Sequence, residues 1–128
     1  MARNYKELEV WQLSYKLTLK FYKITNNFPE HENNNLISQI RRASSSVPLN
    51  IAEGCSRRTK KSFLQFLTYG YGSLRELQVL LELSKDLNYI NKKDYKELEE
   101  DLDKISRKMF NFMKFVEKEK FYSWFKND

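Results

Sequence analysis

Six cationic side chains lie close together in the middle of the chain, and their chemistry is that of anion binding. They fall between residues 41 and 61, where Glu53 is the one acidic residue, so this stretch holds a net charge of +5 out of +6 for the chain. The cations are Arg41, Arg42, Arg57, Arg58, Lys60 and Lys61. Such a local excess is typical of a surface that contacts a polyanion, and we expect it to bind RNA or DNA. The alternative is a solvated surface that keeps the protein soluble.

Residues that could carry out catalysis are few, and none is placed as catalysis requires. His31 is the one histidine, so the Glu-x-x-His pairs of a di-iron bundle are missing. Cys55 is the one cysteine, and the serines at residues 44–46 have no histidine nearby in sequence to act as a base. The run YGYGS lies inside a predicted helix, whereas a phosphate-binding loop follows a strand. We therefore expect no enzyme activity, no metal and no cofactor.

The remaining composition points to a reducing compartment. A single cysteine cannot form a disulfide within the chain. The first residues, MARNYKELEVW, have no apolar signal core, and no apolar run approaches the roughly 20 residues that span a bilayer. The expectation is a soluble, cytoplasmic protein with no membrane partner.

Apolar residues recur at spacings of three and four in four segments, which predicts four helices around one core. We expect these helices at residues 5–26, 32–53, 60–87 and 92–118. Because the chain has 3 Gly and 2 Pro, the connections should be short. The predicted fold class is all-α, an antiparallel up-down four-helix bundle over residues 1–120. An aromatic tail follows at residues 121–128, and it either packs on a bundle or stacks on exposed bases.

Four small or rigid residues in the second and third predicted helices should shape the bundle. Pro48 lies inside the second helix, frees the carbonyl group of Ser44 and should kink the helix. Gly54 should end that helix in the left-handed conformation. When the second and third helices are paired across their connection, Ser44 to Ser46 fall opposite Gly70 and Gly72, so the two backbones should approach closely.

The same pairing places two of the cations beside an acidic residue of the third helix. Arg41 and Arg42 fall level with Glu76. We expect one arginine to form a partly buried bidentate pair with that carboxylate and the other to point outward. Part of the basic patch would then be architectural.

Two runs of the sequence carry a family resemblance. LISQIRRASSSVPLNIAEGCSRR, followed by FLQFLTYGYGSLRELQVLLELSKDLNYI, resembles the small four-helix-bundle proteins encoded in intervening sequences of bacterial 23S ribosomal RNA genes. It is also similar to the accessory variability determinants of diversity-generating retroelements, which share that fold. The resemblance covers about residues 7–117, and QIRRA, VPxNIAEG and GSLxE carry it. It implies a homo-oligomeric bundle with pentameric rings, no known catalysis, and a role around RNA or reverse transcription.

An excess of apolar residues also indicates self-association. A bundle helix needs about three apolar positions in seven. The first predicted helix has four apolar or aromatic residues outside the stripe that should face the core: Trp11, Tyr15, Leu19 and Tyr22. The third predicted helix has a dense run of apolar residues: Leu74, Leu77, Val79, Leu80, Leu81 and Leu83. One core cannot face all of them, so we expect a homo-oligomer. The predicted function is a non-catalytic accessory factor that binds RNA or DNA; the alternative is a protein-interaction scaffold, for example for a reverse transcriptase.

Overall fold

The computed structural model describes residues 3–120, and every regular element in that part of the chain is a helix. The four long helices are α1 (Glu9–Thr25), α2 (Leu36–Cys55), α3 (Lys60–Asp86) and α4 (Lys92–Lys118), and short 3-10 helices lie at Tyr5–Glu7 and Glu30–Glu32. Residues 3–120 contain no strand, so the predicted all-α, four-helix class is confirmed. The predicted aromatic tail, residues 121–128, lies outside the described residues.

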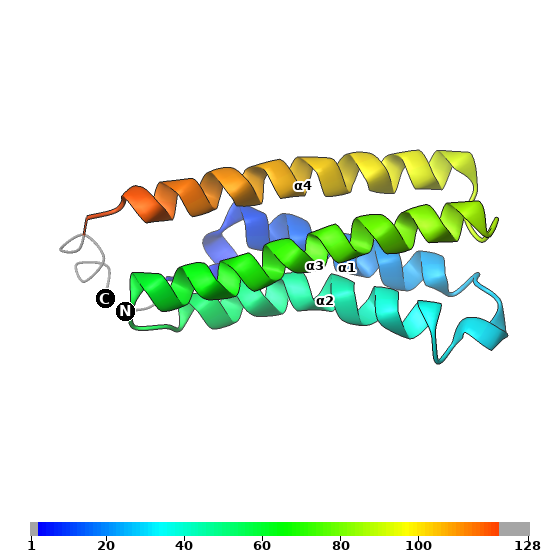
Figure 1. Ribbon diagram of the computed structural model, residues 1–128, viewed down its shortest axis with the longest axis horizontal. Helices are drawn as coiled ribbons and strands as arrows, with labels where there is room; N and C mark the ends of the chain where they lie inside the picture. The colour runs from blue at the N-terminus through cyan, green and yellow to red at the C-terminus, as the bar shows by residue number, and fades with distance from the viewer. Residues whose placement is uncertain (1–2, 121–128) are drawn as a thin grey trace.

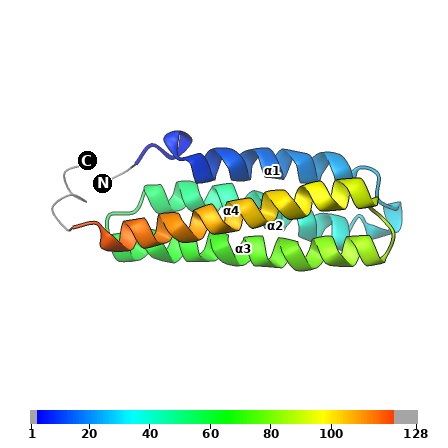
Figure 2. The ribbon, with the colours of Figure 1, turned by 90° about the horizontal axis from the view of Figure 1, so that it is seen from above.

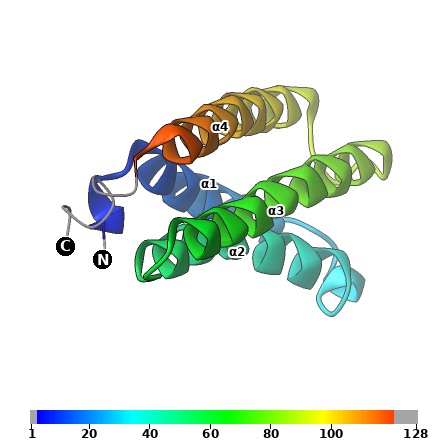
Figure 3. The same ribbon diagram turned by 60° about the vertical axis from the view of Figure 1, so that its left-hand side comes forward.

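The four helices lie side by side with their long axes roughly aligned (Figure 1). The connections α1–α2 and α3–α4 lie at one end of the molecule, and the α2–α3 connection lies at the other (Figure 1). Seen from above and from the side, α1 lies across from α3, and α2 lies across from α4 (Figures 2 and 3). Each helix therefore packs against two neighbours, most extensively α2 against α3 and least closely α1 against α4.

One apolar core runs the length of the four helices, as the periodicity predicts. In α3 the buried residues are Phe63, Leu67, Gly70, Leu74, Leu77, Leu80, Leu81 and Ser84. In α4 the buried side chains are Leu98, Leu102, Ile105, Met109 and Val116. These positions repeat every three to four residues, which keeps one face of each helix toward the core.

Side-chain and backbone caps fix the ends of α3 and α4. The Thr59 hydroxyl accepts a hydrogen bond from the amide of Ser62 at 3.1 Å, and the Asn91 side chain accepts one from the amide of Asp94 at 2.8 Å. At the end of α3, Asn88 adopts a left-handed φ of 62° and the amide of Tyr89 bonds to the carbonyl of Ser84 at 2.9 Å. This is a Schellman ending, with asparagine in the position that glycine usually takes.

The prediction that Gly54 ends α2 in the left-handed conformation is wrong. No glycine within residues 3–120 has a positive φ, and α2 continues to Cys55. Gly54 is instead a contact point between α2 and α3, because a Cβ atom there would lie 2.8 Å from Cδ1 of the fully buried Phe63. A glycine is needed at this position for space rather than for conformation.

Pro48 lies inside α2, which continues on both sides of it as one helix. A proline at this position leaves the carbonyl of Ser44 without its intrahelical partner. The hydroxyl of Thr18, on α1, lies 2.8 Å from that carbonyl oxygen and donates to it. The sequence predicts the freed carbonyl, and the structure identifies its partner on the neighbouring helix.

The two glycines of α3 differ in their surroundings. Gly70 is buried, and a Cβ atom there would lie 3.1 Å from Met109 Cε and 3.6 Å from the carbonyl oxygen of Val47. Gly72 is exposed, with no other described atom within 4 Å of such a Cβ, so its predicted role in close packing is wrong. Two residues along a helix turn the side chain by about 200°, which places Gly72 on the opposite face. The partners of Gly70 lie about one turn past the predicted serines.

Candidate nucleic-acid interface

Four of the six cationic residues between residues 41 and 61 lie together at the end of the bundle where α2 connects to α3. We call these four residues, Arg57, Arg58, Lys60 and Lys61, the basic end. Arg57 and Arg58 follow the last turn of α2, and Lys60 and Lys61 begin α3. The Thr59 cap between them starts the new helix at once, so the four cations are held on two helix ends instead of along a long loop. This end of the bundle is the left-hand end in Figure 1.

Lys60 binds another part of the fold. Its ammonium donates to the carbonyl oxygens of Glu117 at 2.9 Å and Glu119 at 2.8 Å. These carbonyls lie at the C-terminal end of α4, where the helix leaves backbone acceptors unpaired and carries partial negative charge. Two of the three ammonium donors are therefore engaged within the protein.

Arg57 lies over an aromatic ring. Its guanidinium carbon is 4.4 Å from the ring centroid of Phe66, and its Nε is 4.0 Å from a carboxylate oxygen of Glu53. The side chain remains half exposed. Stacking on Phe66 fixes the position of this guanidinium while part of it still faces solvent.

Arg58 and Lys61 are the exposed members of the basic end. Among the described residues Lys61 forms no hydrogen bond or ion pair. An exposed cation such as Lys61, which is not committed to the fold, can contact an anion without loss of structure.

The two arginines of α2 have separate surroundings. Arg41 donates to Thr25 Oγ1 at 3.0 Å and Asn26 Oδ1 at 2.9 Å, and its guanidinium carbon lies 4.9 Å from the ring centroid of Tyr22. It therefore binds the C-terminal end of α1, a role that the sequence does not indicate. It neither pairs with an acidic residue of α3 nor belongs to the free surface.

Arg42 is the arginine that lies near Glu76, with Nη2 4.0 Å from Oε2. The two side chains are 74% and 47% exposed, so the pair lies at the surface, and the prediction of a partly buried bidentate pair is wrong. An exposed pair of this kind contributes little to stability. Arg42 thus remains available on the α2–α3 face.

Arg3 joins the basic end from the start of the chain, and no pattern in the sequence indicates it. Its Nη2 donates to a carboxylate oxygen of Glu119, its backbone amide lies 3.3 Å from the carbonyl oxygen of Cys55, and its guanidinium carbon lies 5.8 Å from the ring centroid of Phe63. Residues separated by more than a hundred positions meet here, so no local spacing could predict the contact.

Cys55 lies buried next to the basic end, and its thiol is a poor nucleophile. Its thiol is buried, and burial raises its pKa to about 11, although the nearby Arg3 charge acts in the opposite direction. Since the thiolate is the nucleophile, a thiol with a raised pKa is a poor one.

Acidic side chains gather toward the other end of the molecule, in the first half of α4. Glu97, Glu99, Glu100, Asp101 and Asp103 lie there. Lys20 of α1 reaches across to this region and pairs with Glu97 at 3.3 Å and Asp101 at 2.7 Å. A lysine of α1 therefore partly balances the carboxylates of α4.

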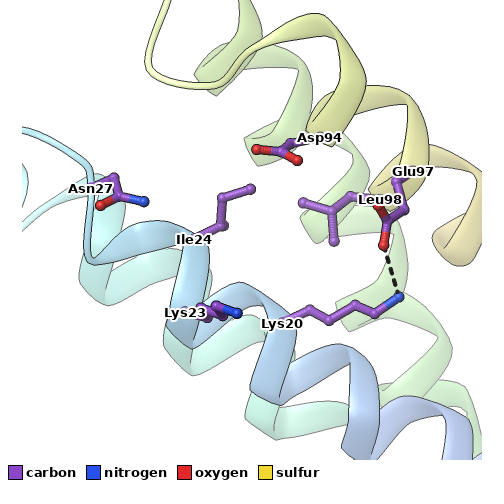
Figure 4. Close-up of a pocket in the computed structure, with 7 residues that line it drawn as sticks. All are labelled: Lys20, Lys23, Ile24, Asn27, Asp94, Glu97 and Leu98. Carbon is purple, nitrogen blue, oxygen red and sulfur yellow. Dashed lines mark hydrogen bonds and ion pairs between the residues drawn. The ribbon is translucent and has the colours of Figure 1, made fainter.

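An open groove of about 320 Å³ lies between α1 and α4 beside these pairs (Figure 4). Lys20 extends toward Glu97, while Ile24 and Leu98 face each other across the groove (Figure 4). The residues that line it include neither a nucleophile with a base nor a cluster of metal-binding side chains. Throughout residues 3–120, no group of three or more histidine, cysteine, aspartate or glutamate side chains could hold a metal ion. Within the same part of the chain, every helix is too short or too polar to cross a bilayer.

Comparisons with known proteins identify a family by its sequence profile and a shared fold by a solved structure. Residues 6–111 match the profile of the family described as 23S rRNA-intervening sequence protein. A crystal structure described as a protein with unknown function from the S23 ribosomal protein family, from Bacteroides thetaiotaomicron VPI-5482, has a TM-score of 0.74 at 23% sequence identity. The match covers 82% of this chain and 98% of that one, and at this identity it establishes the shared fold. No curated protein matches the sequence.

Proposed function

The chain belongs to the family of 23S rRNA-intervening sequence proteins, and from this membership and the basic end we propose that it is a non-catalytic accessory protein that binds RNA or DNA by charge. The family description names an RNA gene as the place where such proteins are encoded. It is the surface of this chain that points to a nucleic acid as the partner.

The observation that supports the proposal is the exposure of the cations. Arg58 and Lys61 are exposed, and Arg57 is half exposed while held over Phe66. Lys60 is left with a supporting role, since it binds the end of α4. Arg42 extends the same surface along α2.

Such a surface would bind phosphates and would not read sequence. Each phosphate that a cation neutralises releases condensed counterions, so the affinity should fall steeply as salt is added. Sequence readout needs side chains that reach base edges in a groove, and no such element occurs among the described residues. Binding should therefore be strong in low salt and weakly dependent on sequence.

The test is a salt titration of two triple variants with labelled RNA and DNA. Replacing Arg57, Arg58 and Lys61 with serine should weaken binding at every sequence. It should also reduce the slope of log affinity against log salt by about 0.7–0.9 for each phosphate that the variant no longer neutralises. The matched control replaces the exposed Lys92, Lys93 and Lys96 at the start of α4, and its affinity should stay close to that of the unchanged protein. Absence of binding even in low salt would contradict the proposal.

We also propose that the protein acts as a homo-oligomer, for which a pentameric ring is the expectation from the family resemblance. Several large apolar side chains are exposed in one chain, including Leu19 and Tyr22 on α1 and Val79 and Leu83 on α3. A closed ring would cover these two faces and repeat the basic end in each copy, so weak contacts would add by avidity.

A second candidate function is a protein-interaction scaffold. The same exposed apolar faces support it, because a partner such as a reverse transcriptase could cover them in place of a second copy. The relation to accessory variability determinants of retroelements belongs to this candidate. A protein that binds no nucleic acid but co-purifies with a co-expressed reverse transcriptase would favour it.

The proposal also includes the direction of the four helices and the shape of α2. We propose that the four helices run up and down in alternation, and that α2 bends at Pro48 over its neighbours. A crystal structure in which α2 has a straight axis through Pro48 would contradict the second of these.

A further inference from the structure

An exposed aromatic ring lies beside the basic end, on the face that α2 and α3 share. Tyr69 is 50% exposed. Its ring meets the ring of Phe66 edge-on, with centroids 5.7 Å apart and planes at 83°. Phe66 in turn carries the Arg57 guanidinium at 4.4 Å. A cation and two aromatic rings therefore form one continuous row, which we call the Arg57–Phe66–Tyr69 row.

The exposed ring of this row is held in place. The Tyr69 hydroxyl accepts a hydrogen bond from Gln65 Nε2 at 2.8 Å, one turn back along α3. Together with the edge contact to Phe66, this fixes the ring, so an incoming flat group would meet a prepared surface at small entropic cost. Half of the side-chain surface is open, because a single edge contact covers only part of a ring.

A fixed aromatic surface next to exposed cations has the chemistry of a single-strand binding site. Nucleobases stack on aromatic faces, and every base has such a face, so stacking does not need a particular sequence. In a duplex the base faces are covered by their neighbours, and only phosphates and groove edges are presented. A surface that bound phosphates alone would not prefer single strands to duplexes, because a duplex has the higher charge density.

We propose that the basic end binds single-stranded RNA or DNA, with a base stacked on Tyr69 and the adjoining phosphates held by Arg57, Arg58 and Lys61. This inference rests on the proposed nucleic-acid binding and specifies its substrate class. Arg57 has two roles in it, since its guanidinium both contacts phosphate and extends the stacked row. Phe66, which is half-buried, supports the row from below.

A second aromatic residue of the same exposure supplies the control. Phe110 on α4 is also 50% exposed and has the ammonium of Lys114 5.5 Å from its ring centroid. It lies on a different helix from the basic end. A general effect of removing an exposed ring from the protein would therefore appear equally at Phe110.

The experiment measures the affinity of the full chain for fluorescein-labelled oligouridylate and oligothymidylate of about 12 nucleotides, and for a duplex of the same length, in low salt. Tyr69→Leu should weaken binding to both single strands by about 5- to 150-fold, the range expected for one stacked base, and should leave duplex binding unchanged. Tyr69→Phe should retain the affinity, because it keeps the ring. Phe110→Leu should change no affinity by more than about twofold.

Three results would overturn the inference. If the protein binds single strands and duplex equally and Tyr69→Leu has no effect, charge-driven binding stands and stacking fails. If Tyr69→Leu alters the mass of the protein in solution, Tyr69 belongs to a contact between copies. If neither single strands nor duplex bind, the proposed function itself fails, and the stacking proposal fails with it.

Discussion

Adjacent residues of the basic end, Lys60 and Lys61, have different partners and should have different effects. The Lys60 ammonium binds two carbonyl oxygens at the end of α4, whereas Lys61 is exposed. Lys60→Met should therefore lower the free energy of unfolding by about 1–2 kcal/mol, because the backbone acceptors of α4 lose a charged donor. Lys61→Met should leave stability within about 0.5 kcal/mol of the unchanged protein.

The same two substitutions should affect nucleic-acid affinity in the opposite order to their effects on stability. Lys61→Met removes an available phosphate-binding cation and should weaken binding, while Lys60→Met should have the smaller effect. Urea denaturation and a low-salt binding titration on the same two variants measure both. Equal losses of affinity would mean that Lys60 releases α4 to bind the nucleic acid.

The buried carboxylate of Glu32 links the two connections at the other end of the bundle. It accepts hydrogen bonds from the Tyr89 hydroxyl at 2.8 Å, the Asn35 side chain at 3.1 Å and the backbone amide of Leu36 at 3.4 Å. The bond from Tyr89, followed by those from Leu36 and Asn35, lowers the pKa of Glu32 below its usual 4.5, while desolvation acts in the opposite direction. His31 is the other titratable group facing it, 3.9 Å from the carboxylate.

Acid should therefore weaken the fold at this point. A carboxyl group whose pKa is lower in the folded state stabilises the fold above its unfolded pKa, and this contribution is lost as the pH falls below about 4.5 and through the lower folded value. Glu32→Gln should be less stable than the unchanged protein at neutral pH and should lose less stability on acidification. Urea denaturation between neutrality and about pH 3 measures this, with the exposed Glu30→Gln as the control. Parallel pH profiles for Glu32→Gln and the unchanged protein would contradict the assignment.

The sequence predicts the cluster of cations between residues 41 and 61, but it does not predict which of them bind other helices of the bundle. Arg41 and Lys60 bind backbone or side-chain oxygens of other helices, and nothing in the spacing of residues 41–61 indicates those contacts. Both are engaged because the ends of α1 and α4 leave acceptors that only a neighbouring helix can satisfy. Helix register and side-chain rotamers decide such contacts, and a linear pattern contains neither.

At the scale of elements, α2 shows how a helix accepts an interior proline. Thr18 donates to the carbonyl of Ser44 that Pro48 leaves unpaired, at 2.8 Å in a buried setting. Thr18→Val keeps the shape and a similar helix propensity but leaves a buried acceptor unsatisfied. It should lower the free energy of unfolding by about 1–2 kcal/mol.

Thr68 provides the control for this prediction. Its hydroxyl donates to the carbonyl of Leu64 within α3 at 2.8 Å, and the residue is exposed. Thr68→Val should cost less than about 0.5 kcal/mol, because water can replace the bond. Equal costs in urea denaturation would show that the Thr18 hydroxyl does not support α2.

The periodicity of apolar residues predicts the helices well and their contact faces less well. The boundaries of α3 and α4 match the expected ranges closely, whereas the first expected helix begins with the separate 3-10 turn Tyr5–Glu7. Pairing the helices by distance from their connection places Gly72 on the packed face with Gly70, but each residue turns the helix by about 100°. Glycine commonly ends helices, yet at Gly54 the space required by Phe63 decides the residue type.

At the scale of the whole molecule, the apolar excess seen in the sequence separates into buried and exposed parts. Of the dense run in α3, Leu74, Leu77, Leu80 and Leu81 are buried in the chain's own core. Val79 and Leu83 remain exposed on α3, as do Tyr15, Leu19 and Tyr22 on α1. Two separate apolar faces on one chain are the requirement for a head-to-tail contact that closes into a ring.

This arrangement predicts that the protein is an oligomer at about 10 µM and that a charge on either face dissociates it. Leu19→Asp and Val79→Asp should each give the monomer mass in multi-angle light scattering, because burying an unpaired carboxylate costs several kcal/mol. Both positions are exposed within the chain, so each variant should keep its helical circular dichroism. Lys16→Asp, an exposed change on α1 outside the apolar face, should retain the mass of the unchanged protein. In a head-to-tail ring each variant keeps one intact face, so a mixture of the two should form dimers that neither variant forms alone. A monomer mass for the unchanged protein would leave both faces for a different partner and favour the scaffold function.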